Sequence, residues 1–286
     1  MLLADFIRRG IENLGSLYPS PEARGLVLML CRERLGTESY THIVEPLTAV
    51  PAGMEERLEE DLRRLCTGEP VQYVLGFAEF CGRRFSVGPG VLVPRPETEL
   101  LVAEAVRALG GVGAPRALDL CTGSGCIAWS LALDIPGAEV IGLDLSAAAL
   151  DYARRQFLSA AGEFYKPVFL RADVLDTEQE VPYGPFDLIV SNPPYVREAE
   201  RVQMRPNVLD WEPAEALFVP DGDPLLFYRA IARWAQRFLR PGGTGIVEIN
   251  ESLGPETSDI FRAAGLKNIQ IQRDFAQKER FIRFTR

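Results

Sequence analysis

The chain has 286 residues, of which 47% are hydrophobic and 25% are charged, with a formal net charge of −9 and an isoelectric point of about 4.9. These values predict a soluble globular protein of about two domains and exclude collagen, coiled coils and long disordered segments. The negative charge disfavours a protein that holds nucleic acid by charge alone. We therefore expect no direct nucleic-acid binding, although a local basic patch is compatible with an acidic whole.

Targeting and metal-binding signals are both weak. Asp5 interrupts the N-terminal segment at once, and the longest strongly apolar run, residues 26–31, is far shorter than the roughly 20 residues that span a bilayer. We expect a cytoplasmic protein without membrane association. His42 is the only histidine, and the five scattered cysteines form no Cys-x-x-Cys pair. The sequence therefore predicts a reducing compartment and no metal site.

Residues 1–70 are expected to form a small helical domain. One helix begins near Ser20-Pro21 and ends at Gly36, which are typical start and stop residues. Apolar residues at helical spacing predict two buried stripes, one formed by Ala23, Leu26, Val27 and Leu30 and the other by Leu58, Leu62 and Leu65. The charged residues between the stripes are interpreted as a solvent-exposed face.

Residues 71–96 are expected to form a β-hairpin that links this domain to the next. Short strands are predicted at residues 71–76 and 85–87. Glycines and a proline at residues 82 and 88–90 mark the turns.

Residues 97–286 are expected to form an α/β domain, because predicted helices and apolar strands alternate along them. Such alternation predicts a mainly parallel sheet with helices on both faces. Helices are predicted, among others, at residues 97–109, 146–157 and 225–239. Strands are predicted at residues 117–120, 140–144, 168–173, 186–191, 245–249, 269–271 and 281–284. The last two strands are too close in sequence for a helical crossover and should pair antiparallel.

Three of these strands end in residues suited to a nucleotide cofactor, which binds such sheets at the carboxyl ends of the strands. Asp119 lies in the first strand, which runs into the glycine-rich loop Cys121-Thr122-Gly123-Ser124-Gly125. Asp144 ends the second strand and suits ribose hydroxyls, and Asp173 ends the third and could accept the amino group of adenine. Each residue is also compatible with a turn or a helix cap. Both NAD and S-adenosylmethionine use such a set, and the dinucleotide fingerprint tolerates Ala128 at its third glycine position, so this loop leaves the cofactor open.

The fourth strand is followed by the most specific motif of the chain, Asn192-Pro193-Pro194-Tyr195. The two prolines fix backbone torsions and hold the Asn192 amide and a neighbouring carbonyl in place. This motif resembles that of S-adenosylmethionine-dependent methyltransferases that act on amino groups of planar systems, namely adenine N6, cytosine N4 or a glutamine side-chain amide.

Further segments narrow the resemblance to the release-factor glutamine methyltransferases, the PrmC/HemK family. The matching segments are residues 70–76, Phe80, residues 91–99, 212–217 and 240–243. The resemblance implies a seven-stranded, Rossmann-like class I methyltransferase sheet at residues 97–286, with residues 1–70 as a substrate-recognition domain. It also implies S-adenosyl-L-methionine as the cofactor, and the glutamine of the Gly-Gly-Gln loop of peptide chain release factors as the substrate.

The resemblance implies a role for each matching residue. The Asn192 side-chain oxygen and the Pro193 carbonyl would accept the two N–H bonds of the substrate amide, and the Tyr195 ring would pack against that amide or the cofactor. No general base is implied, because a methylated, positively charged amide is a very strong acid. The candidate catalytic residues are thus Asn192, Pro193, Pro194 and Tyr195. The candidate cofactor-binding residues are Asp119, Cys121, Thr122, Gly123, Ser124, Gly125, Asp144, Asp173, Val174 and Asn192, and Arg95, Glu97 and Thr98 are expected to line the active site.

The chain departs from the family pattern at three places. Cys121 stands where many members have glycine, and Glu248-Ile249-Asn250 with Leu253 departs from a more usual Glu-x-Gly…Gln pattern. Residues 219–224 replace a more glycine-rich stretch. These departures concern local loop shape rather than the reaction.

Three alternatives remain open at the level of sequence. A DNA adenine-N6 methyltransferase would share the Asn-Pro-Pro-Tyr chemistry, but it would need a basic channel for a flipped base. A glutamine methyltransferase that modifies a ribosomal protein would share even more of the motifs. A non-catalytic cofactor-binding module would have no physical need of Asn192 and Tyr195.

Overall fold

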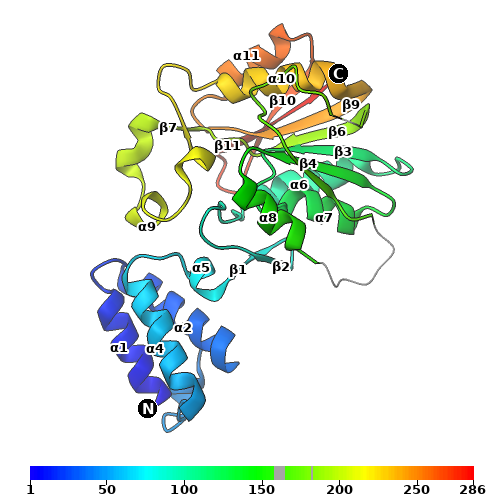
Figure 1. The fold of residues 1–286 in the computed structure, drawn as a ribbon. Coiled ribbons are helices and arrows are strands. Elements are labelled where there is room, and N and C mark those ends of the chain that lie inside the picture. Colours follow the sequence, from blue (N-terminus) through cyan, green and yellow to red (C-terminus); the bar gives the residue numbers. More distant parts are fainter. Residues whose placement is uncertain (158–164, 182) are drawn as a thin grey trace. The chain divides into compact units, whose positions relative to one another are not determined.

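The computed structural model describes residues 1–157, 165–181 and 183–286 (Figure 1). The chain divides into two compact units. The first comprises Met1–Phe77 with Arg205–Trp211, and the second comprises Ala78–Met204 with Glu212–Arg286. An N-terminal helical region and an α/β region are therefore both present, as the sequence predicts.

The first unit is built from helices around one apolar core. Its helices are α1 (Leu3–Leu14), α2 (Ser20–Leu35), α3 (Thr41–Val44), α4 (Ala52–Cys66), α5 (Val71–Leu75) and α9 (Pro206–Leu209). Both predicted apolar stripes line the core, and only Leu26 is half-buried rather than buried. A Cβ atom on Gly10 would lie 2.9 Å from the Val27 side chain, so this glycine allows α1 to approach α2 closely.

The strand predicted at residues 71–76 is wrong, because residues Val71–Leu75 form helix α5. Pro70 precedes the helix and Gly76 ends it in the left-handed conformation, with φ of 87°. These are helix start and stop signals. Val71 and Val74 are three residues apart, so both lie on the buried side of a single helical turn.

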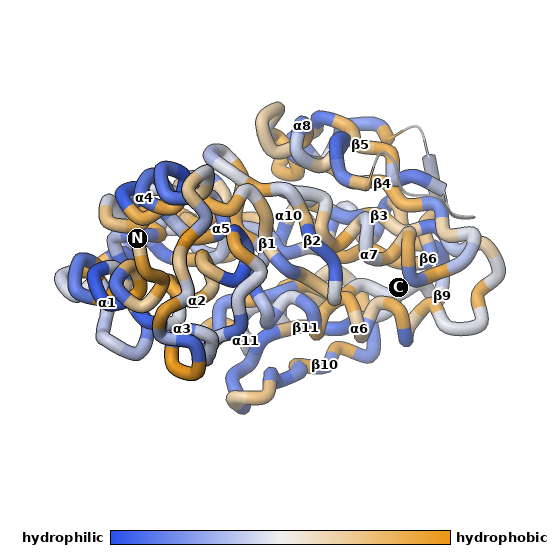
Figure 2. The backbone as a smooth tube through the Cα atoms, turned by 90° about the horizontal axis from the view of Figure 1, so that it is seen from below, coloured by the Kyte–Doolittle hydropathy of each residue, from blue (hydrophilic) through white to orange (hydrophobic). Residues whose placement is uncertain are grey.

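One segment of the first unit exposes large apolar side chains. Figure 2 shows a strongly hydrophobic stretch at α3, and the side chains of Ile43, Val44 and Leu47 are 62%, 62% and 82% exposed. Tyr40, just before α3, is 56% exposed. Clustered exposure of this kind is uncommon on a surface that meets only water.

The second unit contains the predicted sheet. A two-stranded hairpin, β1 (Phe77–Phe80) and β2 (Arg83–Ser86), precedes helix α6 (Thr98–Leu109). The main sheet has the strand order β10-β11-β9-β6-β3-β4-β5. Its strands are β3 (Arg116–Leu120), β4 (Glu139–Asp144), β5 (Val168–Arg171), β6 (Phe186–Ser191), β9 (Leu239–Glu248), β10 (Lys267–Arg273) and β11 (Glu279–Thr285). The seven-stranded α/β fold expected from the sequence is thus confirmed.

Strand directions also follow the prediction. β5, β4, β3, β6 and β9 run parallel to one another, whereas β11 pairs antiparallel with both β9 and β10. Most predicted bounds differ from those observed by one or two residues, and the largest difference is at the start of β9. β5 ends at Arg171 rather than at residue 173. β9 begins at Leu239, earlier than residue 245.

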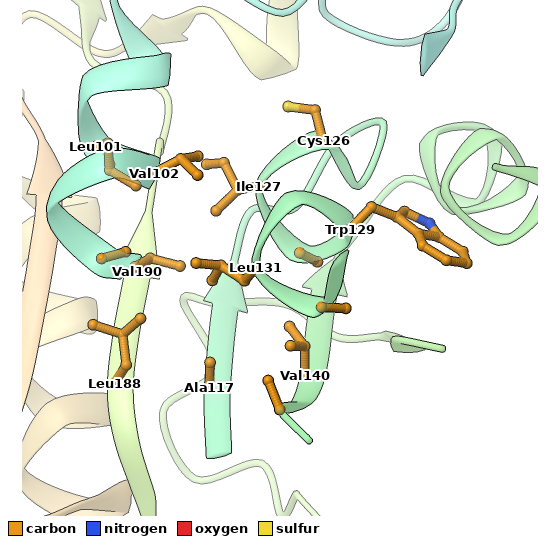
Figure 3. Packing of buried hydrophobic residues seen from close by; sticks show 14 of the residues in the cluster. Leu101, Val102, Ala117, Cys126, Ile127, Trp129, Leu131, Val140, Leu188 and Val190 are labelled. Atoms are coloured by element: carbon orange, nitrogen blue, oxygen red, sulfur yellow. The ribbon is translucent and has the colours of Figure 1, made fainter. Parts of the chain in front are cut away.

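Helices cover both faces of the sheet, as Figure 1 shows. The remaining elements of this unit are α7 (Cys126–Asp134), α8 (Ala147–Arg155), α10 (Leu226–Phe238), α11 (Gly254–Ala263), the short strands β7 (Val196–Arg197) and β8 (Phe218–Val219), and the 3₁₀ turns η1 (Glu198–Gln203) and η2 (Ala214–Ala216). Side chains of β6 alternate between the faces: Leu188 and Val190 pack toward α6 and α7 (Figure 3), and Ile189 packs with the core under α10 and α11.

Two tryptophans fix helices to neighbouring segments, α7 to α8 on one face of the sheet and α10 to the turn after β5 on the other. On one face the Trp129 Nε1 of α7 donates to the Ala153 carbonyl at 2.8 Å. On the other, the Trp234 Nε1 of α10 donates to the Val174 carbonyl at 2.8 Å. Both rings are buried, so each indole N–H has the partner that burial requires.

Parallel register brings four chain segments to one edge of the sheet. Leu120 of β3 pairs with Leu143 of β4 and with Ser191 of β6, and Ser191 pairs with Val247 of β9. The residues that follow these positions therefore emerge side by side at the carboxyl edge, where ligands of such sheets bind. Within the part of the chain that the structure describes, no helix is both long enough and apolar enough to cross a membrane.

Candidate active site

The loop after β3 is shaped by a run of left-handed backbone conformations. Cys121, Gly123 and Gly125 have φ of 60°, 55° and 77°. The Thr122 amide donates to the Leu143 carbonyl at 2.9 Å, which fixes the loop to the end of β4. A Cβ atom on Gly125, the N-cap residue directly before α7, would lie 3.0 Å from Ala153, so this position requires glycine for space as well as for φ.

Cys121 occupies its left-handed conformation without the freedom of glycine. This is the position at which the sequence departs from the family, and the backbone there is the one that glycine adopts at no cost. The thiol packs with the core beneath α10 and α11, and burial raises its pKa well above the ordinary value. The Cys121 thiol is therefore protonated at neutral pH.

Asp119 is fully buried and holds the loop to the start of α7. Its Oδ2 accepts from the Thr122 hydroxyl at 2.6 Å and from the Ala128 amide at 3.2 Å. Oδ1 is buried and has no hydrogen-bond partner among the described residues. Burial raises the pKa of this carboxyl to about 7, while the bonds from Thr122 and Ala128 lower it.

Asp144, at the end of β4, binds the same loop from the other side. Its two oxygens accept from the Gly123 amide at 2.8 Å and from the Ser146 amide at 2.9 Å. Ser146, not Asp144, caps helix α8, because its hydroxyl accepts from the Ala149 amide. Burial raises the pKa of Asp144. The backbone amides of Ser146, Gly123 and Leu145 lower it. A carboxylate has about four acceptor positions, so Asp144 can accept a further bond from a hydroxyl.

Asp173 lies two residues beyond β5 rather than in the strand. Its Oδ1 accepts from the Leu175 amide at 2.9 Å, so the side chain also shapes its own turn. Val174 is buried beside it. The glycine-rich loop, Asp144 and Asp173 follow three adjacent strands, so the structure brings the predicted cofactor-binding residues to one edge.

The Asn-Pro-Pro-Tyr segment leaves the end of β6 and is tied to its neighbours on both sides. The Ser191 hydroxyl donates to the Leu120 carbonyl at 2.7 Å, and Pro193 and Pro194 are buried. Asn192 donates through Nδ2 to the Thr98 hydroxyl oxygen at 3.2 Å, and Tyr195 donates through its hydroxyl to a carboxylate at the end of β9.

That carboxylate belongs to Glu248, which the sequence analysis treated only as part of a departure from the family. Its Oε1 accepts from Tyr195 at 2.9 Å and its Oε2 accepts from the Thr98 hydroxyl at 2.8 Å. The residue is 1% exposed, and burial raises its pKa against the effect of these two bonds. An acid directly after the buried apolar residues Ile246 and Val247, in a strand next to β6, was the signal that could have identified it.

Asn250, in the same departure, supports the motif from the far side. Its Nδ2 donates to the Tyr195 carbonyl at 3.1 Å and to the Glu200 carboxylate at 2.9 Å. Its backbone amide donates to the Tyr228 hydroxyl at 3.2 Å. Asn250 stands where a glycine is more usual, and its side chain therefore fixes the backbone after Pro194 through these bonds.

The segment before α6 contributes unequally to the site. Thr98 is buried and bonded to Asn192, as expected of a lining residue. Glu97 is exposed at the start of α6, and its charge raises the pKa of Glu248. Arg95 pairs with the buried Glu212 at 2.6 Å, and Glu212 also accepts from the Val93 amide at 3.0 Å. Glu212 thus fixes the path of this segment, a role that its sequence position did not reveal.

Comparison with known proteins agrees with this geometry. A family model described as the PrmC N-terminal domain matches residues 5–76, and one described as the methyltransferase small domain matches residues 97–224. A release factor glutamine methyltransferase of Bacteroides thetaiotaomicron is 40% identical over 96% of this chain and 97% of its own. One from Flavobacterium psychrophilum is 34% identical over 99% of each chain.

A solved structure supports the fold alone. The 16S rRNA N2 G1207 methyltransferase of T. thermophilus, in complex with AdoMet and guanosine, has a TM-score of 0.50 and 22% sequence identity. The similarity covers 73% of this chain and 49% of that one. The second unit therefore has the fold of a class I methyltransferase.

The buried Asp119 predicts a particular dependence of stability on pH. Its folded pKa of about 7 lies above the ordinary value of 3.8, so the folded state binds more protons than the unfolded state between these pH values. Stability contributed by this group is present at low pH and is lost as the pH rises toward 7, by at most about 1.4 kcal/mol per pH unit. Asp119→Asn should remove this decline, so the variant gains relative to the parent as the pH rises. Urea unfolding of both proteins between pH 5 and 8 measures the difference.

Asp259→Asn is the control, because it removes an exposed carboxylate from α11 and changes the net charge equally. Parallel profiles for parent and Asp119→Asn would contradict the assignment.

Proposed function

Because the chain belongs to the release factor glutamine methyltransferase family, we propose that it methylates N5 of the glutamine in the Gly-Gly-Gln loop of peptide chain release factors, with S-adenosyl-L-methionine as the methyl donor. The observation that carries this proposal is the state of Asn192. Its Nδ2 is engaged with Thr98, so its Oδ1 is the end left to accept a bond from a substrate N–H. An oxygen in that position suits a carboxamide NH₂.

Two acceptors hold the substrate amide. The Asn192 Oδ1 and the Pro193 carbonyl accept one N–H bond each, and the two prolines fix both oxygens before the substrate arrives. An amide nitrogen is a poor nucleophile because its lone pair is delocalised into the carbonyl. Acceptors on its two N–H bonds stabilise the positive charge that develops as that lone pair attacks. The proton is then lost readily from the cationic amide, so no general base is required.

The residues at the carboxyl edge fit S-adenosyl-L-methionine. When bound, this cofactor supplies an electrophilic methyl group on a sulfonium centre. The unpartnered Oδ1 of Asp119 is a buried acceptor, and a Cβ atom placed on Gly123 would meet open space. Asp144 offers carboxylate oxygens at the next strand end, where a ribose would present two hydroxyls. Asp173 and Val174 follow on the third strand and complete the proposed adenosine-binding side.

We also propose that the helical unit, expected as residues 1–70, recognises the release factor. Its exposed apolar side chains at Tyr40, Ile43, Val44 and Leu47 support this role. The segment of residues 71–96, which contains helix α5 and the hairpin β1–β2, then acts as the linker to the catalytic domain at 97–286, and the cytoplasmic location stays a prediction.

Transfer of labelled methyl groups tests the function. The purified protein is incubated with labelled S-adenosyl-L-methionine and, separately, a release factor, an unmethylated DNA duplex with adenine sites, and a ribosomal protein. We expect label only in the release factor, on the glutamine of a Gly-Gly-Gln peptide after mass analysis. Label on DNA adenine or on the ribosomal protein would support the corresponding alternative, and no label on any substrate would support a non-catalytic module.

Asn192→Ala should abolish transfer without abolishing cofactor binding. Removal of one acceptor from a preorganised site lowers kcat by at least about 100-fold, because the developing charge on nitrogen loses a partner. Single-turnover transfer to the release factor measures the loss, and calorimetry with the cofactor measures binding. Intact binding together with unchanged transfer would refute the assigned role.

Replacement of the exposed apolar side chains should affect protein recognition alone. The triple variant Ile43→Ser, Val44→Ser, Leu47→Ser should raise KM for the release factor by about tenfold, because it removes contact area from the proposed interface. Its rate on a short Gly-Gly-Gln peptide, which lacks the rest of the release factor, should equal the parent rate. An unchanged KM for the intact factor would show that the release factor does not use this surface.

A further inference from the structure

A chain of hydrogen bonds connects Glu248 at the end of β9, Thr98 at the start of α6, and Asn192 after β6. The Thr98 hydroxyl donates to Glu248 Oε2 at 2.8 Å, and the Asn192 Nδ2 donates to the Thr98 oxygen at 3.2 Å. Glu248 and Thr98 are 150 residues apart in sequence, and both are buried. The two bonds form a relay from a buried charge to the motif residue proposed to touch substrate.

The direction of each hydrogen bond follows from whether each group can donate or accept a proton in it. An ionised carboxylate only accepts, and both oxygens of Glu248 are engaged, one by Tyr195 and one by Thr98. The single hydroxyl proton of Thr98 is therefore committed to Glu248. The Thr98 oxygen can then only accept, so Asn192 must present its NH₂ to it and its Oδ1 away from it.

We infer that Glu248, acting through Thr98, is a positioning residue that selects the amide orientation of Asn192 and so makes the site an acceptor of N–H bonds. This inference rests on the proposed function and deepens it. An asparagine flipped by 180° has almost the same shape but presents NH₂ to the substrate. Donor would then face donor, and the substrate N–H that Asn192 should accept would have no partner.

The groups around Glu248 keep the donor and acceptor roles in these hydrogen bonds fixed. Tyr195 and Thr98 donate to it, the cationic Arg280 of β11 acts on it from another side, and Glu97 adds an opposing negative charge. Tyr228 of α10 lies near enough for its own pKa to respond to Glu248. A buried carboxylate held by two donors and a nearby cation defines which groups around it donate and which accept.

The relay offers isosteric variants that separate orientation from packing. Thr98→Ser keeps the hydroxyl and removes a methyl group, whereas Thr98→Val keeps the shape and removes the hydroxyl. Thr257→Val is the matched control, because Thr257 is also a buried threonine of this unit, its hydroxyl donates to the Leu253 carbonyl at 2.7 Å, and it belongs to α11 outside the site. Glu248→Gln is a second variant, which replaces the carboxylate that accepts the Thr98 hydrogen bond.

The first readout is spectroscopic and independent of transfer. The side-chain amide signals of Asn192 are assigned in a ¹⁵N-correlated NMR spectrum by their loss in Asn192→Ala. We expect them to keep their shifts and slow hydrogen exchange in Thr98→Ser and Thr257→Val, and to move and exchange faster in Thr98→Val. Unchanged Asn192 signals in folded Thr98→Val would overturn the inference.

The second readout is the separation of kcat from KM with the release factor. Thr98→Val should lower kcat by about 10- to 100-fold with KM and cofactor affinity within about threefold of the parent, and Thr98→Ser should restore most of the rate. Thr257→Val should keep the parent kcat. Equal losses in Thr98→Ser and Thr98→Val, or parallel losses of rate, KM and cofactor affinity, would show a merely structural role and overturn the inference.

The variants and readouts also decide two further cases. If Thr98→Val does not fold, Glu248→Gln carries the same two readouts, since its NH₂ group disturbs the donor order without loss of volume. It should lower kcat by about tenfold and shift the Asn192 signals, and parent-like behaviour would overturn the inference. If the parent transfers no methyl group to the release factor, the proposed function fails, while the NMR readout still decides whether Glu248 and Thr98 orient Asn192.

Discussion

The parallel pairing of β6 with β3 on one side and β9 on the other determines where the site can form. The register sets Leu120, Ser191 and Val247 side by side, so the next residue of each strand emerges at the same edge. Those next residues begin the cofactor loop at Cys121, the proposed acceptor segment at Asn192 and the buried Glu248. A shift of one residue would turn these side chains to the opposite face and separate the groups.

This constraint explains why the edge tolerates an unusual density of buried polar groups. Asp119 and Glu248 are both almost inaccessible, and burial of a carboxylate is costly unless other groups hydrogen-bond to it. Asp119 receives bonds from the loop and α7, and Glu248 receives bonds from α6 and Tyr195. Asp119 joins β3 to the loop and the helix that follow it directly, whereas Glu248 joins segments that are far apart in the sequence. The hydrogen bonds of Glu248 therefore depend on the sheet register that brings its donors within reach.

The parts of the site that could be predicted from the sequence are those in which a functional residue directly follows or ends a recognisable strand. The Asn-Pro-Pro-Tyr motif directly follows an apolar strand, and Asp144 directly ends another, so their places could be predicted from strand order alone. The antiparallel pairing of β10 and β11 followed from the shortness of their connection. In each case a local pattern carried enough information to place the residue.

The remainder depended on contacts between distant segments. Nothing in the local pattern of Glu248 or Thr98 indicates that they share a hydrogen bond, because the fold alone brings them together. The segment at residues 71–75 was interpreted as a strand, since a short apolar run fits either period. Pro70 and Gly76 at the ends of this segment, together with the packing of Val71 and Val74 in the helical core, favour the helix.

The same geometry indicates which acceptors the proposed chemistry would favour. A carboxamide NH₂ offers two protons, which match the Asn192 Oδ1 and the Pro193 carbonyl. A hydroxyl or thiol offers one, so one oxygen would be left without a partner, at a cost of about 1–3 kcal/mol for a buried polar group. That cost corresponds to a preference of roughly 10- to 100-fold for an amino group over a hydroxyl. Selection of this kind needs fixed acceptors rather than a titrating base, and it is accessible to a chain whose single histidine, His42, lies in the helical unit.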